Sequence, residues 1–118
     1  MPTIVRIPSS AADQPRTPVD PGRLISGQPA QAVANAYSTA DERFHCGIWE
    51  GDVGAWRVRC TEHELCHMLT GTVRMIGDDG SETMFAAGDS FVIPAGFEGI
   101  WEVLEPARKL YAVYEPER

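Results

Sequence analysis

The pentapeptide His-Glu-Leu-Cys-His at residues 63–67 combines residue types at a spacing that could do chemistry. In zinc peptidases the string H-E-x-x-H places two histidine ligands and a glutamate general base on one face of a helix. Thr61 and Glu64 have the spacing of a capping box, which would start such a helix. A motif of five residues also arises by chance, so its meaning depends on the element that carries it.

The residues that flank this pentapeptide alternate as they do in a β-strand. Before it, Trp56, Val58 and Cys60 alternate with two arginines, and after it Gly71 would end a helix within about two turns. On a strand, His63, Leu65 and His67 face one way, while Glu64, Cys66 and Met68 face the other. The two histidines and the glutamate then cannot share a metal ion, and we expect both histidines to face outward or into an interface.

The rest of the sequence predicts one small all-β domain. The chain has 118 residues, enough for one core. After Ala40, short segments of β-branched, aromatic or alternating residues are separated by turn residues. The Asp-Gly pair within residues 77–80 suits a tight hairpin between the segments TVRMI and ETMFA. This pattern favours a sandwich or closed barrel, with strands over most of residues 43–115.

The first forty residues have a different composition. From Pro8 to Pro29 the chain is rich in Pro, Ser, Ala and Asp and shows no sustained periodicity. We therefore divide the chain into an N-terminal arm at 1–40, which packs on the barrel and can add an edge strand to it, and a barrel at 41–118. Barrel faces covered by such arms commonly dimerise, so we expect a homodimer.

Charge and cysteine usage limit the partners and the location. The chain has 10 Lys and Arg against 17 Asp and Glu, for a net charge of -7, and no basic run. Nucleic acid and membrane surfaces are therefore not expected partners, whereas a small molecule is. No apolar stretch resembles a signal peptide or a membrane span, and three cysteines without a secretory signal are expected as free thiols. We expect a soluble, cytoplasmic protein.

The spacing around Glu64 also fits a longer pattern. Glu64 is followed by six residues and Gly71, and Gly88 is followed by five residues and then Pro94-Ala95-Gly96. This skeleton resembles the cupin motifs G-x5-H-x-H-x(3,4)-E-x6-G and G-x5-P-x-G-x2-H-x3-N. From about Gly27 onward, segments such as ELCHMLTGTV and AGDSFVIPAGFEGIWEV are similar to small bacterial cupins related to ureidoglycine aminohydrolases and the ethanolamine-utilisation Q protein. The resemblance implies a double-stranded β-helix, which is a jelly-roll barrel.

The same resemblance implies a metal site of three histidines and a glutamate, from which this chain departs. The remaining motif positions hold other residues: Val58 and Cys60, or with the longer spacer Arg57 and Arg59, in the first motif, and Gly99 and Val103 in the second. Glu64 alone matches, and one carboxylate does not make a tight transition-metal site. We therefore predict no metal and no other cofactor.

Strand alternation then predicts which residues line the barrel. Trp56 and Cys60 should face inward with Glu64, and Trp101 should fill space that a metal and its histidines would otherwise occupy. A carboxylate facing apolar walls needs a compensating partner. The candidates are Lys109, Tyr111, a ligand's own donors, or a barrel arginine if the strand phase is shifted. Among them the family resemblance favours Lys109.

Three functions remain open. In the first, Glu64 is the acid or base of a metal-independent enzyme, and Lys109 or Tyr111 orients an oxygen-rich substrate, as in some sugar-epimerising cupins. In the second, the barrel binds a metabolite or regulates without chemistry. In the third, Glu64 acts with Cys60 or Cys66 in an atypical metal site. The predicted ligand-binding residues are Trp56, Cys60, Cys66 and Trp101, although aromatic rings and thiols of this kind also fill ordinary cores.

Overall fold

A computed structural model of the protein describes residues 2–116, and the regular structure in this range is entirely β. No helix in this part of the chain is long and apolar enough to cross a membrane. The all-β prediction is confirmed. The strands are β1 (Thr17–Pro18), β2 (Leu24–Gly27), β3 (Ala30–Ser38), β4 (Phe44–Gly51), β5 (Gly54–Arg59), β6 (His63–Gly77), β7 (Glu82–Ala86), β8 (Ser90–Ile93) and β9 (Glu98–Tyr114).

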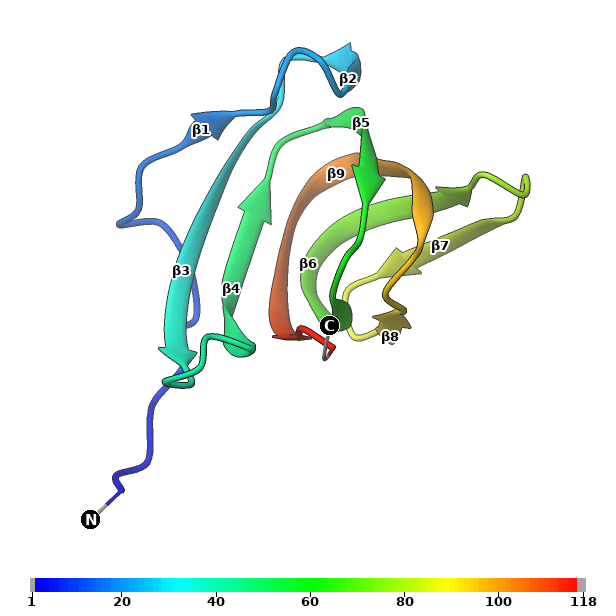
Figure 1. Cartoon of the computed structure of the whole chain (residues 1–118). Helices are drawn as coiled ribbons and strands as arrows, with labels where there is room; N and C mark the ends of the chain where they lie inside the picture. Colours follow the sequence, from blue (N-terminus) through cyan, green and yellow to red (C-terminus); the bar gives the residue numbers. More distant parts are fainter. Residues whose placement is uncertain (1, 117–118) are drawn as a thin grey trace.

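Two long strands, β6 and β9, pair antiparallel along their length and bend together (Figure 1). The first half of β6 and the second half of β9 form a first layer, with β4, β3 and β1 on one side and β8 on the other. The other two halves form a second layer with β5, β2 and β7. One curled antiparallel sheet thus faces itself, as in a jelly-roll barrel.

The bend depends on Gly71, the glycine of the longer motif. Its φ is +84°, a conformation that residues with a side chain rarely adopt. A Cβ at this position would lie 2.3 Å from the carbonyl oxygen of Pro106 and 2.7 Å from Cα of Ala107. The β6–β9 register shifts between Met68 and Val73, where the two strands cross closely. Gly71 therefore allows β6 to pass from one layer into the other.

The pentapeptide at 63–67 lies on β6, and its side chains alternate as the sequence predicts. Leu65 is 48% exposed, whereas Cys66 and Met68 are fully buried. Cys66 and Met68 join the core between the layers, together with Trp56, Trp101 and other residues of the second layer. The strand interpretation of the pentapeptide is confirmed. The predicted hairpin is also present, since Ile76 pairs with Glu82 across the turn at 77–80.

Residues before Ala40 contribute strands to both layers. β3 pairs along β4, and β2 pairs with β5. β3 has the sequence AQAVANAYS, whose alanines are weak indicators of a strand, so its full length is not evident from composition. Ahead of β1, Ala11 packs with Ala32 and Ile48 on the outer side of the first layer, and its backbone N–H donates to Glu50.

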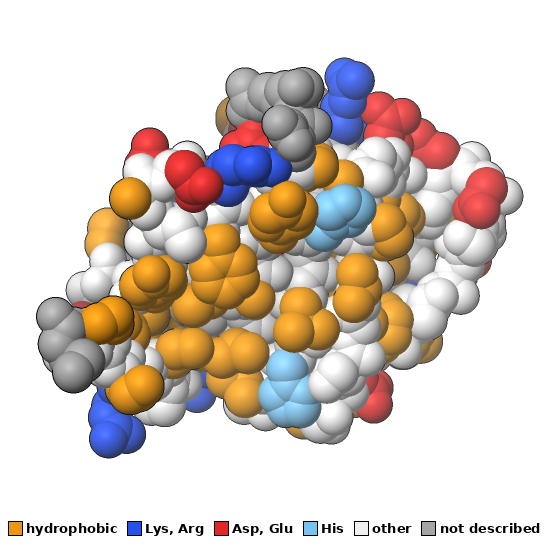
Figure 2. All heavy atoms as spheres, turned by 60° about the horizontal axis from the view of Figure 1, so that its bottom comes forward, with side chains coloured by type: hydrophobic (Ala, Val, Ile, Leu, Met, Phe, Trp, Pro, Cys, Tyr) orange, Lys and Arg blue, Asp and Glu red, His pale blue; other side chains and the backbone are white. Residues whose placement is uncertain are grey.

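Another part of that outer side carries exposed apolar side chains. Leu65 on β6 pairs with Val92 on β8, and both side chains are about half exposed. Tyr114, also about half exposed, stacks against His63. Figure 2 shows hydrophobic side chains gathered over one face of the molecule, with histidine side chains between them. We call the face that carries Leu65, Val92, Tyr114 and the two histidines of β6 the outer apolar face.

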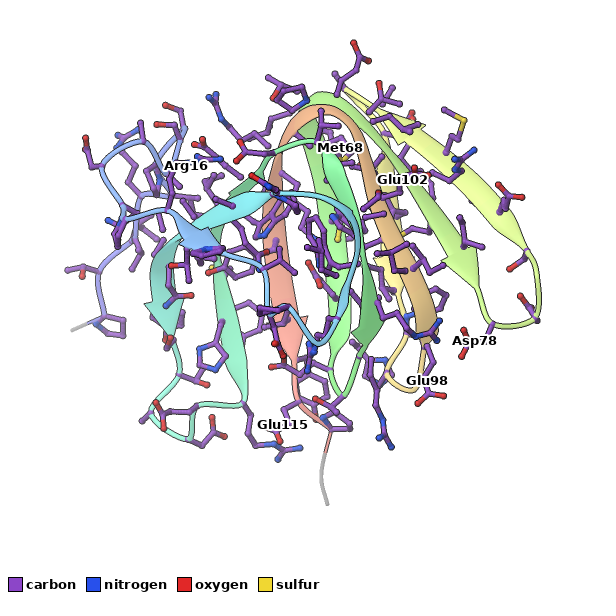
Figure 3. All side chains as sticks on the ribbon, turned by 90° about the horizontal axis from the view of Figure 1, so that it is seen from above. Arg16, Met68, Asp78, Glu98, Glu102 and Glu115 are labelled. Carbon is purple, nitrogen blue, oxygen red and sulfur yellow. The ribbon has the colours of Figure 1, made fainter. Side chains whose placement is uncertain are left out.

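The arginines of β5 point away from the core. Arg57 pairs with Asp78 and Arg59 pairs with Glu98. Figure 3 shows Asp78 and Glu98 on the outside of the second layer. The strand phase is therefore not shifted, and neither arginine can compensate Glu64.

Candidate functional site

A cavity of about 590 Å³ opens between the two layers. Side chains of both layers form its wall, and three tryptophans lie among them. Apolar groups cover more of the wall than polar ones. The lining residues are Gln31, Val33, Asn35, His45, Trp49, Trp56, Val58, Cys60, Glu62, Glu64, Met75, Ile93, Trp101, Lys109, Tyr111 and Val113.

Glu64 and Lys109 form an ion pair in this wall. Both face inward from neighbouring strands, Glu64 on β6 and Lys109 on β9, and Lys109 Nζ donates to Glu64 Oε2 at 2.7 Å. The side chains are 19% and 8% exposed, respectively. A buried charge is tolerated when it is paired and hydrogen-bonded. Lys109 is thus the partner for Glu64 that the family resemblance favours.

The Lys109 ammonium is enclosed by aromatic rings and a sulfur atom. Nζ lies 4.4 Å from the ring centroid of Trp101 and 5.3 Å from that of Trp49. These two rings meet edge to face, with centroids 5.6 Å apart. Cys66 Sγ lies 3.5 Å from Nζ and donates to Glu64 Oε2. The electron-rich ring faces stabilise the cation in a position that solvent hardly reaches.

The environment keeps three of these groups protonated. Burial by itself lowers the pKa of Lys109, but the charges and hydrogen bonds of Glu64 and Cys66 outweigh it, so this pKa lies above its usual value. Burial raises the pKa of the Cys66 thiol to about 12. Burial also raises the pKa of Tyr111 to about 12. At neutral pH the site therefore offers an ammonium, a thiol and a phenol, and none of these three is an activated nucleophile.

Of the residues that the sequence proposed for the site, six lie in the cavity wall: Glu64, Lys109, Tyr111, Trp56, Cys60 and Trp101. Cys66 is fully buried behind them and contacts Glu64 and Lys109 instead of the cavity. The indole Nε1 of Trp101 is buried and has no hydrogen-bond partner within residues 2–116. Whether any of these residues binds a ligand or takes part in catalysis remains a prediction.

Sequence reasoning missed the part of the wall that β3 and β4 supply. Tyr111 donates its phenolic hydrogen to Asn35 Oδ1 at 2.8 Å. Trp49 Nε1 donates to Gln31 Oε1, also at 2.8 Å. Asn35 and Gln31 belong to the segment interpreted as an arm, so their position could not be inferred. Glu62 was also missed, although it shares the strand parity of Glu64 and could have been found from it.

The wall does not fit the metal site that the longer motif implies. Val58, Gly99 and Val103, in three of the motif positions, have no metal-binding side chain, and Glu64 Oε2 is occupied by the Lys109 ammonium. Within residues 2–116, no three His, Cys, Asp or Glu side chains are grouped to hold a metal ion. His63 Nδ1 accepts from the backbone N–H of Ala95, and His67 Nδ1 contacts the Ser90 hydroxyl. Neither histidine lies near Glu64 in the manner of a zinc peptidase.

Comparisons with known proteins show that this chain is similar to small cupins. The family model of the EutQ-like cupin domain matches residues 38–111. A Thermotoga maritima DUF861-family protein of known structure is 30% identical over 67% of the chain and 96% of its own length, with a TM-score of 0.54. No curated protein matches the sequence significantly.

Two larger proteins share the fold at lower identity. A Pseudomonas syringae protein of unknown function, assigned to the DUF861 family, is 23% identical over 94% of this chain, with a TM-score of 0.75. The Clostridium difficile EutQ protein is 23% identical over 75% of this chain, with a TM-score of 0.66. The matches span 44% and 65% of the lengths of these two proteins, respectively.

Proposed function

Because the chain belongs to the EutQ-like cupin domain family, in which the fold alone does not specify an activity, we propose that its cavity binds a small organic molecule and that Glu64 exchanges a proton with this molecule without a metal ion. The observation that supports this proposal is the Glu64–Lys109 pair in the wall of a cavity of about 590 Å³. A cavity of this size, with apolar walls and a few polar groups, is typical of ligand sites.

The pair suits proton exchange because the two carboxylate oxygens of Glu64 have different surroundings. Lys109 and Cys66 both contact Oε2, whereas Oε1 makes no hydrogen bond within residues 2–116. Lys109 therefore holds the carboxylate in place, and Oε1 is the oxygen that would take a proton from a bound molecule and return it. A general base must lie within hydrogen-bond reach of the proton it abstracts. In this proposal Lys109 and Tyr111 position the carboxylate and the wall rather than act as nucleophiles.

A second candidate function is binding or regulation without chemistry. It is favoured by the raised pKa values of Cys66 and Tyr111, each about 12, because they leave no thiolate or phenolate at neutral pH. A site whose thiol and phenol stay protonated can bind a metabolite as readily as transform it. The two functions differ in what happens to a bound molecule, so they are separated by following that molecule.

The experiment combines a metabolite library with the variant Glu64→Gln. Library members that raise the melting temperature of the wild type should lose this effect in Glu64→Gln, because the amide has the shape of the carboxylate but not its charge or basicity. Each hit is then incubated with the protein in deuterated water. Incorporation of deuterium at a carbon atom by the wild type but not by the variant supports proton exchange, because hydrogens on oxygen and nitrogen exchange with water without the protein. Binding without exchange leaves the second function. A library response unchanged in the variant would overturn the role of Glu64 in proton exchange, and the absence of any response in the wild type would contradict both functions.

We also propose that two copies of the chain associate through the outer apolar face. Leu65, Val92 and Tyr114 lie exposed on this face, and exposed apolar patches commonly mark association sites. An isologous pair of identical faces is the commonest way for soluble proteins to bury such a patch. We place the protein in the cytoplasm, in keeping with the three free thiols.

A further inference from the structure

Lys109 is the only lysine or arginine that lines the cavity within residues 2–116, and the protein already engages it. An ammonium has three hydrogens to donate. In Lys109 they are directed to Glu64 Oε2 at 2.7 Å, to Cys66 Sγ at 3.5 Å and toward the aromatic rings, with the Trp101 centroid 4.4 Å from Nζ. Tyr111 likewise donates its hydroxyl hydrogen to Asn35. A negatively charged ligand would therefore find neither a free cation nor a free phenol in this wall.

Negative charge, by contrast, remains available in the cavity. Glu62 and Glu64 lie on the same face of the chain, and both line the cavity. Glu62 is half-buried and makes no hydrogen bond or ion pair within residues 2–116, and Glu64 Oε1 makes no hydrogen bond there either. Glu62, Glu64 and Lys109 together carry an excess of one negative charge. The wall also contains His45, whose two ring nitrogens contact the Ser38 hydroxyl and the Glu42 backbone carbonyl.

The pKa of the neighbouring Cys60 thiol is consistent with an excess of negative charge in the cavity. Burial, together with the charges of Glu64 and Glu62, raises the pKa of Cys60, although Lys109 opposes them. The whole chain has a net charge of -7, which adds to the attraction of cations and the repulsion of anions. Trp101 Nε1 is a donor without a partner among residues 2–116, but it is uncharged and so does not favour anions.

The remaining wall suits an apolar group attached to the charged one. Trp56, Val58 and Ile93 line the cavity, and the ring of Trp56 is not among those that contact Lys109. A tryptophan face attracts cations as well as apolar groups. The carboxylates and this apolar wall belong to one cavity, so a single molecule can contact both.

We propose that the molecule bound in this cavity is an organic cation, a primary amine in its ammonium form with a hydrocarbon body. The ammonium donates to the Glu62 carboxylate and to Glu64 Oε1, and the hydrocarbon body packs on Trp56, Val58 and Ile93. This assignment rests on the proposed binding function and specifies its substrate class.

The test uses probes that differ only in their end group. Phenethylammonium, phenethyl alcohol and hydrocinnamate carry the same ring and linker with a positive, a neutral and a negative end, and butylammonium, butanol and valerate form an aliphatic counterpart. Isothermal titration calorimetry with the full chain at low salt measures each affinity. We expect the ammonium to bind about tenfold more tightly than the alcohol in at least one series, which corresponds to one favourable charge interaction, and the carboxylate to bind most weakly.

Two variants with the same change in net charge locate the effect. Glu62→Gln removes a carboxylate from the wall and should weaken ammonium binding about fivefold, while alcohol binding stays the same. Asp13→Asn removes a carboxylate at an exposed position outside the wall and should change neither affinity.

The outcomes separate the two proposals. Ammonium binding that prefers the cation and weakens only in Glu62→Gln supports the assignment. Tighter binding of the alcohol or carboxylate, or equal weakening in both variants, overturns the assignment. If a probe binds the wild type but not Glu64→Gln, the proposed binding function is supported even where the assignment to an ammonium has failed. Binding of no probe in either series overturns the assignment as well, and the metabolite library then decides whether the cavity binds anything else.

Discussion

Glu64 and Lys109 are 45 positions apart in the sequence, and they meet because β6 and β9 pair antiparallel with both side chains facing inward. Each stabilises the other in surroundings that solvate neither charge well. Glu64 is the one metal-ligand position of the longer motif that this chain keeps, and its carboxylate is bound to Lys109 instead. At the scale of single residues, the site is therefore a carboxylate fixed by an internal ammonium.

We expect the two members of this pair to be strongly coupled in stability. Glu64→Gln and Lys109→Met should each lower the free energy of unfolding by about 2 kcal/mol, because each leaves a poorly solvated charge without its counterion. The double variant should lose much less than the sum, with a coupling energy of about 1 to 3 kcal/mol. Urea unfolding of the four proteins measures this energy.

The pair Arg59–Glu98 serves as a control on the surface. Its members are separated by 3.2 Å but are largely exposed, so Arg59→Met and Glu98→Gln should couple by less than about 1 kcal/mol. Equal coupling in the two pairs, or additive effects of Glu64→Gln and Lys109→Met, would contradict the role assigned to burial.

The raised pKa of Cys66 predicts lower stability at alkaline pH. Its usual value of 9.0 applies to the unfolded chain, and the folded value is about 12. Between these two pH values the unfolded state releases the proton and the folded state keeps it. This contribution is therefore unchanged below pH 9.0 and falls as the pH rises above it, by up to about 1.4 kcal/mol per pH unit. The raised pKa of Lys109 acts in the same direction above its usual value of 10.5.

Unfolding free energies measured from neutral to alkaline pH test this prediction. In Cys66→Ala the decline above pH 9.0 should be shallower than in the wild type. Cys46→Ala, at a half-buried thiol of β4, controls for the loss of a cysteine. Parallel curves for wild type and Cys66→Ala would show that Cys66 does not retain its proton in the folded state.

At the scale of elements, the fold depends on how β6 and β9 turn from one layer into the other. The halves of each strand serve different layers, so the bend brings Glu64 of the first layer opposite Trp56 and Trp101 of the second. Gly71 lies at this bend against the backbone of Pro106 and Ala107. The close crossing of β6 and β9 that joins the two layers therefore requires a residue without a side chain at this position.

Gly71→Ala should be much more costly than the same change at Gly80. Both glycines have positive φ, +84° and +88°, and so both variants incur backbone strain of about 1 kcal/mol. Around Gly80 no atom lies within 4 Å of an added Cβ, whereas at Gly71 the Cβ would clash with backbone that cannot move freely. We expect a loss of about 3 kcal/mol or more for Gly71→Ala, or failure to fold.

Thermal or urea unfolding of the two variants compares these costs directly. Similar losses for Gly71→Ala and Gly80→Ala would mean that the crossing of β6 and β9 can open to admit a side chain.

At the scale of the whole molecule, the exposed apolar side chains on the outer apolar face predict association of two chains. Leu65→Glu should shift the protein toward a monomer at micromolar concentration, because it would bury an unpaired charge between the paired faces. Val53→Glu is the control, since Val53 is exposed to a similar degree but lies in the connection between β4 and β5. Sedimentation equilibrium of wild type and both variants measures the shift. A monomeric wild type, or an equal effect of the two variants, would contradict the proposed interface.

From the sequence alone, the all-β class, the strand at 63–67, the hairpin at 77–80 and the inward set of Trp56, Glu64 and Trp101 could be predicted. These features follow from local rules, because strand side chains alternate and Asp-Gly pairs favour tight turns. The departure from the cupin metal motif was equally visible, since it depends only on which residue types occupy given positions.

Tertiary structure alone decided what surrounds Glu64. Cys66 shares the parity of Glu64 but lies behind the wall, because the depth of a side chain depends on the opposite layer as well as on its own strand. Trp49, Gln31 and Asn35 line the cavity because β3 and β4 pair with the rest of the barrel. The alanine-rich sequence of β3 does not predict this pairing. Lys109 contacts Glu64, Cys66 and two tryptophans only because strands that are distant in sequence pair in one register. Register is a property of the folded sheet.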